Sequence, residues 1–180
     1  MTELLPISQL GNPILRQQAQ PIDDIQNEQI QTLIDNLLAT LLQTSGVGIA
    51  APQVAASCQL LIVASHPNAR YPNAPYVEPI AMINPQIMAH SDEQVKGWEG
   101  CLSVPGIRGL VPRYSAITVS YTDRDGQSQQ QELTDFLARI FQHEYDHLNG
   151  ILFVDRVEST HDLFTEQEYQ RQIALNLEPG

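Results

Sequence analysis

The chain carries a His-Glu-x-x-His pattern in its last third, formed by His143, Glu144 and His147. On an α-helix, residues four apart project from one face, so the two imidazoles can bind the same metal ion. Glu144 then lies beside that metal. A metal held in this way acidifies a water molecule, and the carboxylate can shuttle its proton. The pattern therefore indicates metal-assisted hydrolysis.

A catalytic metal site usually has three protein ligands and one open position, so a third ligand must come from elsewhere. No histidine or glutamate after His147 has the spacing typical of zinc proteases. Cys101 is the best candidate, because a thiolate suits a soft or borderline metal such as Fe(II) or zinc. Taken alone, Cys101 could equally be a buried structural thiol. The other cysteine, Cys58, precedes an apolar run and is expected to be a small buried hydrophobic residue.

The segment that holds the two histidines is expected to be a helix, because apolar residues precede His143 at helical spacing. Thr134 or Asp135 can cap its start, and Gly150 can close its end. An earlier amphipathic helix is predicted from the apolar residues of 30–42 and should end at residues 45 and 46.

Short apolar or β-branched runs between these helices indicate strands. Asp125 and Gly126 form a turn signal, which predicts a hairpin on either side of them. Asn84 and Pro85 are expected to stop one short strand. Residues 65–79 are proline-rich and predict a surface excursion, and a capping box at Thr165 predicts a last helix through about residue 177. The predicted strands cover 59–64, 81–83, 86–95, 117–122 and 129–133.

Strands before and after two main helices predict an α+β fold, with mostly antiparallel strands around the central helix that bears the His-Glu-x-x-His pattern. The chain has 180 residues, with no internal repeat and no linker-like segment. We therefore expect one domain over residues 1–180, with an irregular arm over residues 1–26.

The net charge of the chain is -12, from 9 basic and 21 acidic residues. Such a surface repels phosphate backbones and anionic lipids, which argues against DNA binding and against binding to a membrane surface. The sequence contains no long apolar run and no basic-then-apolar leader. We expect a cytoplasmic protein, and a monomer in preference to an oligomer.

Three segments resemble the motifs of peptide deformylases. They read GVGIAAPQ over residues 46–53, EGCLS over 99–103 and QHEYDHLNG over 142–150. All three are intact and stand in the order of the family, and the similarity spans residues 5–157. The resemblance implies a hydrolase of protein biosynthesis that performs N-terminal processing: it removes the formyl group from formylmethionyl nascent polypeptides and releases formate.

The resemblance also implies a role for each motif residue. Cys101, His143 and His147 would bind one divalent metal ion per chain, with Fe(II) expected and Zn(II) or Ni(II) as alternatives. A water bound to that metal would attack the formyl carbon. Glu144 would be the general base that takes the proton of this water and passes it to the departing amine. The side-chain amide of Gln53 and the backbone N–H of Leu102 would hold the developing oxyanion.

A substrate cleft is predicted next to these residues. Glycine at 48 would let an extended peptide approach the backbone closely, while a pocket for the formylmethionine side chain would be lined from the turns before His143. The stem of Arg139 is expected to pack there, with its head reaching water. Arg108 lies where the family places a residue near the cleft, although an exposed arginine is an equal alternative. The candidate substrate-binding residues are Gly48, Val47, Ile140, Phe136, Arg139 and Arg108.

Two further residues are expected to support the site. Glu99 and Arg113 resemble the structural ion pair that steadies the cysteine loop in the family. Asp146 could orient a loop or a histidine, or it could simply face solvent, and we favour the structural role.

Two other functions remain open at this point. A metallo-endopeptidase is supported by the His-Glu-x-x-His pattern alone. A catalytically inactive peptide-binding module is disfavoured by the intact Glu144, since a pure binder needs no base. Some members of the family dock on ribosomal RNA through a basic C-terminal helix. The segment after Ser159 is acidic here, so we expect no more than a transient encounter with the ribosome.

Overall fold

The computed structural model describes residues 2–44, 46–67 and 74–175. Its α-helices are α1 (Glu28–Leu42), α2 (Asp135–Leu148) and α3 (Glu166–Ala174). Short 3-10 helices cover Pro13–Arg16, Ala51–Val54, Phe153–Asp155 and Thr160–Asp162. The strands are β1 (Gly48–Ala50), β2 (Leu60–Ser65), β3 (Val77–His90), β4 (Gln94–Cys101), β5 (Val104–Tyr114), β6 (Ala116–Thr122), β7 (Ser128–Thr134) and β8 (Leu163–Thr165).

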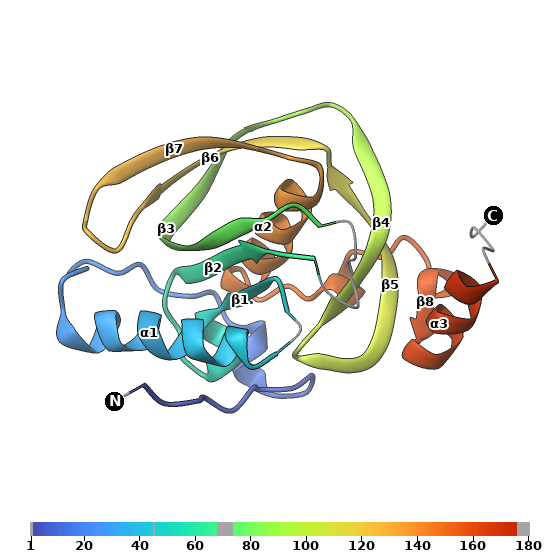
Figure 1. Cartoon of the computed structure of the whole chain (residues 1–180), viewed down its shortest axis with the longest axis horizontal. Helices are drawn as coiled ribbons and strands as arrows, with labels where there is room; N and C mark the ends of the chain where they lie inside the picture. The colour runs from blue at the N-terminus through green and yellow to red at the C-terminus, as the bar shows by residue number, and fades with distance from the viewer. Residues whose placement is uncertain (1, 45, 68–73, 176–180) are drawn as a thin grey trace.

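The strands form two sheets, one in the order β1-β2-β3-β6-β7 and one in the order β4-β5-β8. Every pairing between these named strands is antiparallel. Figure 1 shows α2 in the interior, with α1 along the outside near β1 and β2, and with α3 beside β5. The predicted α+β class, with antiparallel strands around a central helix, is confirmed.

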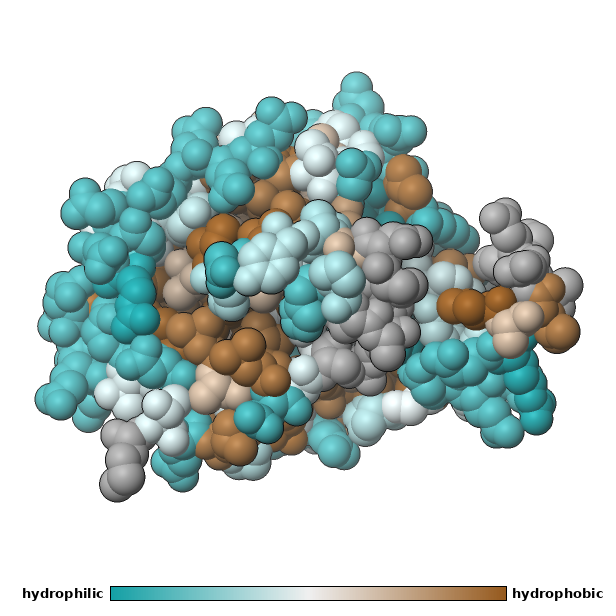
Figure 2. All heavy atoms as spheres, in the orientation of Figure 1, coloured by the Kyte–Doolittle hydropathy of each residue, from teal (hydrophilic) through white to brown (hydrophobic). Residues whose placement is uncertain are grey.

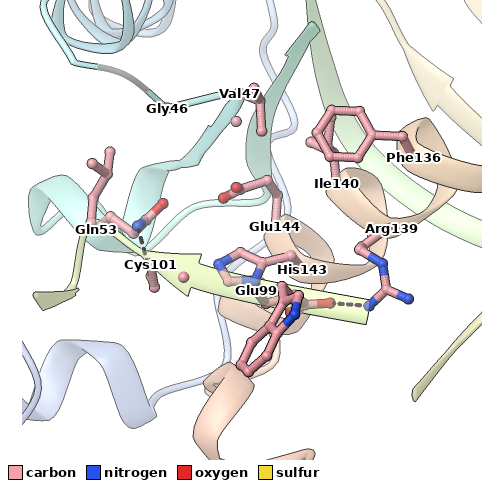
Figure 3. A pocket seen from close by; sticks show the side chains of 14 residues that line it. Gly46, Val47, Gln53, Glu99, Cys101, Phe136, Arg139, Ile140, His143 and Glu144 are labelled. Atoms are coloured by element: carbon pink, nitrogen blue, oxygen red, sulfur yellow. Dashed lines mark hydrogen bonds and ion pairs between the residues drawn. The ribbon is translucent and has the colours of Figure 1, made fainter. Parts of the chain in front are cut away.

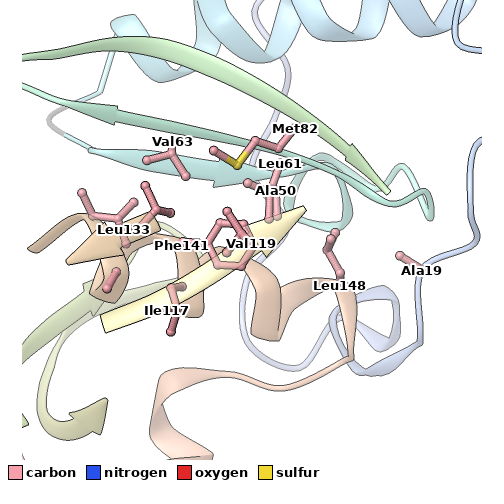
Figure 4. Packing of buried hydrophobic residues seen from close by; sticks show 12 residues of the cluster. Ala19, Ala50, Leu61, Val63, Met82, Ile117, Val119, Leu133, Phe141 and Leu148 are labelled. Carbon is pink, nitrogen blue, oxygen red and sulfur yellow. The ribbon is translucent and has the colours of Figure 1, made fainter. Parts of the chain in front are cut away.

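Strand β2 is buried on both faces, which explains why its sequence is a continuous apolar run. Leu61 and Val63 point to one side and join the cluster around Phe141 of α2, which Figure 4 shows. Leu60 and Ile62 point to the other side and meet the buried face of α1. Each fully buried side chain of this size contributes about 1.5–3 kcal/mol to folding. The sheet is thus clamped between α1 and α2, and this fixes where α2 lies.

The prediction of a short strand that stops at Asn84 is wrong. Strand β3 continues through Asn84 and Pro85 to His90. A register shift between Ile83 and Gln86 absorbs both residues. Asn84 has a φ of 49°, and its side chain accepts from the N–H of Ile22 and donates to the carbonyl of Ile22. A bulge tolerates proline because no ladder hydrogen bond is required there.

Three other features differ from the prediction. The segment around Cys101 forms a long hairpin of β4 and β5, whereas the sequence indicated only a strand and a turn up to residue 95. Thr134 takes the N-cap position of α2, but its side chain makes no capping hydrogen bond. Helix α3 ends at Ala174, a few residues before the predicted end. Residues 176–180 lie outside the described residues, and so does residue 45, at the predicted end of the first helix.

Other predicted features are confirmed. Asp125 and Gly126 lie in the turn between β6 and β7, and the side chain of Thr165 caps α3 by accepting from Glu168. Gly150 has a φ of 71° just after α2. The surface excursion predicted over residues 65–79 differs in its bounds, because β2 extends to Ser65 and β3 begins at Val77. Residues 68–73 lie outside the described residues.

On the face seen in Figure 2, polar residues cover much of the periphery, and apolar residues gather toward the middle, over β1, β2 and the adjoining end of α1. Within the described residues, the structure contains no helix with the length and apolar character needed to cross a membrane.

Candidate active site

Helix α2 presents His143, Glu144 and His147 to the interior, and all three are buried. The two imidazole rings have centroids 5.3 Å apart and meet edge to face. This arrangement follows from their four-residue spacing, because one helical turn separates them on the same face. Phe141 anchors the helix from its opposite face in the apolar core.

Cys101 reaches the same point from the end of β4, and the residues after it, Leu102 and Ser103, form the turn into β5. The sulfur of Cys101 lies 3.2 Å from Nε2 of His147. One donor atom from each of Cys101, His143 and His147 can be chosen so that all three lie within 4.8 Å of one another. A thiolate and two imidazoles so close together are a donor set that suits a divalent transition metal.

A buried charge network orients His143. Its Nδ1 lies 2.9 Å from Oε2 of Glu99, which leaves Nε2 as the nitrogen available to a ligand. Arg113 donates to both carboxylate oxygens of Glu99, at 2.9 and 3.0 Å, and to Asp146 at 2.6 Å. Arg156 also donates to Asp146. The predicted ion pair of Glu99 and Arg113 is confirmed, and Asp146 has the structural role rather than facing solvent.

The charges of this network explain two pKa shifts. Burial disfavours a charged Glu99, but the nearby Arg113 and the hydrogen bonds from His143 and Arg113 outweigh it and hold the pKa of Glu99 below its ordinary value. Burial likewise disfavours the thiolate of Cys101, but the neighbouring His147 and His143 hold the pKa of Cys101 well below its usual range. The cysteine is thus poised as a thiolate, the form that binds metals.

Glu144 is a buried carboxylate with unused hydrogen-bonding capacity. Burial raises its pKa to about 7. Its Oε2 has no hydrogen-bond partner among the described residues. A Cβ placed on Gly48 would lie 2.6 Å from its Oε1, so only glycine at this point of β1 lets the carboxylate lie where it does. A carboxylate of this kind can accept or donate a proton near neutral pH.

Gln53 approaches the cysteine from the 3-10 helix Ala51–Val54. Its Oε1 accepts from the N–H of Ala50 at 2.8 Å, which orients the amide. Its Nε2 lies 3.2 Å from Oγ of Ser103 and 3.5 Å from the sulfur of Cys101. Figure 3 shows the amide nitrogen directed at the cysteine, across the cavity from Phe136 and Ile140. An N–H donor is thus fixed beside the candidate metal ligands.

A cavity opens beside this group of residues, and Figure 3 shows the carboxylate of Glu144 directed into it. The candidate residues at 47, 48, 136, 139 and 140 all line it. Both apolar and polar side chains line the cavity, a usual composition for a ligand site. Its lining comprises Gly46, Val47, Gly48, Gln53, Trp98, Glu99, Gly100, Cys101, Leu102, Phe136, Arg139, Ile140, His143 and Glu144.

Two arginines differ from what their sequence context indicated. The head of Arg139 does not reach freely into water: its side chain is 14 % exposed and donates to Glu99 and to the carbonyls of Val95 and Val111. The guanidinium packs directly against Gly97. A Cβ at this position would lie 2.7 Å from the guanidinium carbon and would collide with it, so only glycine leaves room. Arg108 is not exposed either, since it is 2 % accessible.

Arg108 does not line the cavity beside Glu144 and instead lines an adjoining cavity, at the turn after Cys101. Sequence reasoning missed Trp98, which forms part of the wall of the cavity beside Glu144. Its one available signal was its position next to the EGCLS motif, as the only tryptophan of the chain.

Comparisons with known proteins identify the family of the chain. The sequence model of the family described as polypeptide deformylase matches residues 4–162. The chain is 64 % identical to peptide deformylase 2 of a Nostoc species, over 97 % of both chains. It is 46 % identical to peptide deformylase 2 of Shewanella oneidensis, over 93 % of this chain and 92 % of that protein.

Solved structures give the same result. The fold is similar to a class I type b peptide deformylase of Acinetobacter baumannii with Met-Ala-Ser bound. The TM-score is 0.85, with 45 % identity over 87 % of this chain and 100 % of that chain. A peptide deformylase of Synechococcus elongatus in complex with actinonin matches with a TM-score of 0.78 and 37 % identity, over 88 % of this chain and 81 % of that chain. The matched sequence and fold lead to one conclusion: this chain belongs to the peptide deformylase family, enzymes that remove the N-terminal formyl group from nascent polypeptides.

Proposed function

We propose that Cys101, His143 and His147 hold the divalent metal with which this enzyme removes formyl groups, and that Glu144 is its general base. The observation that carries the proposal is the cluster of three buried donors within 4.8 Å, with a buried carboxylate next to it on α2. A bound metal would polarise the formyl carbonyl and lower the pKa of a water molecule.

Fe(II) is the metal that we propose for the cell, with Zn(II) and Ni(II) able to use the same ligands. A thiolate with two imidazoles suits all three ions. The contact between Glu99 and Nδ1 of His143 supports His143 as a metal ligand, because it fixes the imidazole with Nε2 toward the cluster.

Glu144 would take a proton from the water that attacks the formyl carbon. The carbon–nitrogen bond then breaks, and Glu144 delivers the proton to the departing α-amine, so that formate and a free amino terminus result. A pKa of about 7 suits both halves of this exchange. Its burial in a cavity wall keeps the carboxylate within reach of a substrate rather than of bulk solvent.

The developing negative charge on the formyl oxygen would be held by two N–H donors. One is Nε2 of Gln53, and the other is the backbone N–H of Leu102 in the turn after β4. Both residues line the cavity beside Cys101. Loss of one such donor typically lowers the rate by about 100- to 1,000-fold.

We infer that the substrate is an N-formylmethionyl peptide in an extended conformation. Its methionine side chain would lie against Phe136, Ile140 and the stem of Arg139, and its backbone would run beside Val47 and Gly48 at the edge of the sheet. The related Acinetobacter enzyme has been solved with Met-Ala-Ser bound, which supports a peptide of this kind. Arg108 would contribute to substrate binding only from the adjoining cavity, which it shares with Leu102.

The test is Glu144→Ala, with formyl-Met-Ala-Ser as substrate. We expect the variant to keep its metal and its affinity for Met-Ala-Ser, because neither the ligands nor the methionine pocket changes. Formate release should fall by about 100- to 10,000-fold, the usual contribution of a general base. Glu132→Ala, which removes an exposed carboxylate of β7, is the matched control and should behave as the parent.

Unchanged turnover in Glu144→Ala would rule out the proposed mechanism. A parent protein that cleaves casein but leaves formyl-Met-Ala-Ser intact would instead favour a metallo-endopeptidase. A parent that binds Met-Ala-Ser and cleaves neither would indicate an inactive binding module.

We further infer a single deformylase domain over residues 1–180 that acts as a monomer in the cytoplasm. The family match over residues 4–162 supports one domain. A net charge of -12 argues against stable docking on ribosomal RNA, so we propose only a transient encounter with the ribosome.

A further inference from the structure

The C-terminal segment packs against the hairpin that carries Cys101. Strand β8 pairs with β5, with Leu163, Phe164 and Thr165 opposite Gly109, Arg108 and Ile107 in turn. Figure 1 shows β8 and α3 beside β5, at the opposite end of the molecule from α1. The match to the family model ends at residue 162, directly before β8.

An ion pair connects α3 to the turn at Cys101. The Nε and Nη2 atoms of Arg108 donate to the two carboxylate oxygens of Glu166, at 2.7 and 3.4 Å. The guanidinium also lies over the ring of Tyr169, 5.1 Å from its centroid. The Arg108 side chain is 2 % exposed and the Glu166 side chain 38 % exposed, so the contact is buried on the arginine side and reaches solvent on the glutamate side. The two-point geometry favours it over a single-contact surface ion pair.

Arg108 in turn lies against the backbone of Gly100. A Cβ at Gly100 would be 2.5 Å from Nη1 of Arg108 and 2.8 Å from its guanidinium carbon. Gly100 directly precedes Cys101, and the next peptide unit carries the N–H of Leu102. The position of the guanidinium thus determines where this stretch of backbone can lie.

Strand β8 and helix α3 also support the wall of the cavity beside Glu144. Trp98 meets Phe164 and Tyr169 edge to face, with ring centroids 5.0 and 4.8 Å apart. Trp98 lines the cavity next to Cys101. Aromatic contacts of this kind contribute about 0.5–1.5 kcal/mol each beyond the area they bury.

We propose that β8 and α3 form a C-terminal brace of the active site, and that Glu166 is its positioning residue. Glu166 holds Arg108 against Gly100, and Gly100 sets the position of Cys101 and of the N–H of Leu102. This inference rests on the proposed role of Leu102 as an oxyanion donor. Because a displaced donor weakens binding of the transition state more than binding of the substrate, loss of the brace lowers kcat more than it raises KM.

The experiment compares Glu166→Ala with Glu168→Ala in the full chain. Glu168 is the matched control, since its carboxylate lies on the same helix and pairs with the exposed Arg171. Both variants are measured for kcat and KM with formyl-Met-Ala-Ser, for metal content and for Tm. We expect kcat of Glu166→Ala to fall by about 10- to 100-fold, as for a small misplacement of reacting groups, with KM changed less than threefold. Glu168→Ala should keep the kcat and KM of the parent.

Glu166→Gln provides a second variant if Glu166→Ala does not fold. It keeps an oxygen that can accept from Nε of Arg108 but loses the charge, so its kcat should lie between those of the parent and Glu166→Ala, about two- to fivefold below the parent. A parental kcat in Glu166→Ala, or in Glu166→Gln where that variant decides, would overturn the proposal. Equal losses in Glu166→Ala and Glu168→Ala would overturn it too, because they would reflect a general effect of α3. A parent that releases no formate would contradict the proposed function instead.

Discussion

Gly48 of strand β1 lies against the side chain of Glu144 of helix α2. A Cβ at Gly48 would lie 2.6 Å from Oε1 and 2.8 Å from Cγ of Glu144. We predict that Gly48→Ala displaces this carboxylate and lowers kcat for formyl-Met-Ala-Ser by about 100-fold, because a shift of about 1 Å misaligns the proton transfer.

Metal content serves as the control for Gly48→Ala. The three heavy atoms nearest to the added Cβ all belong to Glu144, so one metal per chain should remain. A parental kcat would show that Glu144 does not need its present position. Loss of the metal would show that Gly48 acts on the ligands instead.

Cys58 offers a test outside the active site. Burial raises the pKa of its thiol from the ordinary 9.0 to about 11. Since the thiolate is the reactive form, we predict that at pH 8 Cys58 reacts with iodoacetamide on the order of 100-fold more slowly in the folded chain than in urea. Mass spectrometry of the peptide that contains Cys58 measures this ratio.

The same shift makes stability depend on pH. Between about pH 9 and 11 the unfolded chain loses the Cys58 proton while the folded chain retains it. The free energy of unfolding should therefore fall across this interval, and the part due to Cys58 should be missing in Cys58→Ala. An identical pH dependence in both proteins would contradict the raised pKa.

Several features of the site could be predicted at this scale, and others could not. Spacing alone put His143, Glu144 and His147 on one helix face. Residue type made Cys101 the best candidate for the third ligand, with a structural thiol as an equal alternative until the resemblance to a family was considered, and Gln53 required that resemblance. The burial of Arg108 was unpredictable, because its partner Glu166 lies far along the chain and no local pattern links them. Contacts between distant segments leave little trace in local sequence.

At the scale of elements, the bulge in β3 shows how one side chain can keep a long strand intact. Asn84 has a φ of 49° and makes two hydrogen bonds to the backbone of Ile22, at 2.9 and 2.8 Å. We predict that Asn84→Ala lowers the free energy of unfolding in urea by about 2–4 kcal/mol. Each lost hydrogen bond contributes about 1 kcal/mol, and alanine is strained at a positive φ.

Asn84→Asp is the matched variant for this prediction. Its carboxylate can still accept from the N–H of Ile22, and aspartate tolerates a positive φ. It should therefore lose less stability than Asn84→Ala. Equal losses would contradict this expectation, since the retained hydrogen bond to the N–H of Ile22 would then not offset the repulsion between the second carboxylate oxygen and the carbonyl of Ile22.

The hairpin of β4 and β5 was harder to predict than the helices, and its glycines and prolines are the reason. Such residues normally indicate loops. Here three glycines stand in strands because large side chains lie on them: Arg139 on Gly97, Arg108 on Gly100 and Phe153 on Gly109. A glycine inside a strand can indicate such a close approach, but the local sequence does not identify the side chain that packs against it. The amphipathic helices could be predicted from the spacing of their own apolar residues, without knowledge of contacts to distant side chains.

At the scale of the whole molecule, three apolar clusters hold the site together. One lies between the large sheet and α2, one between that sheet and α1, and one between the hairpin of β4 and β5 and the segment after α2. Cys101 belongs to the third cluster, while the helix of the two histidines is anchored in the first. The metal ligands are therefore contributed by two separately packed units, which meet at the buried network of Glu99, Arg113 and Asp146.

The central claim is that this chain is a deformylase that depends on one metal ion bound at Cys101, His143 and His147. The most direct measurement is anaerobic purification with metal analysis, followed by formate release from formyl-Met-Ala-Ser before and after chelation and after addition of Fe(II), Zn(II) or Ni(II). We predict one divalent metal per chain, loss of formate release on chelation and recovery on addition of a metal. Full formate release by the metal-free chain, or no formate release by the metal-loaded chain, would contradict the account.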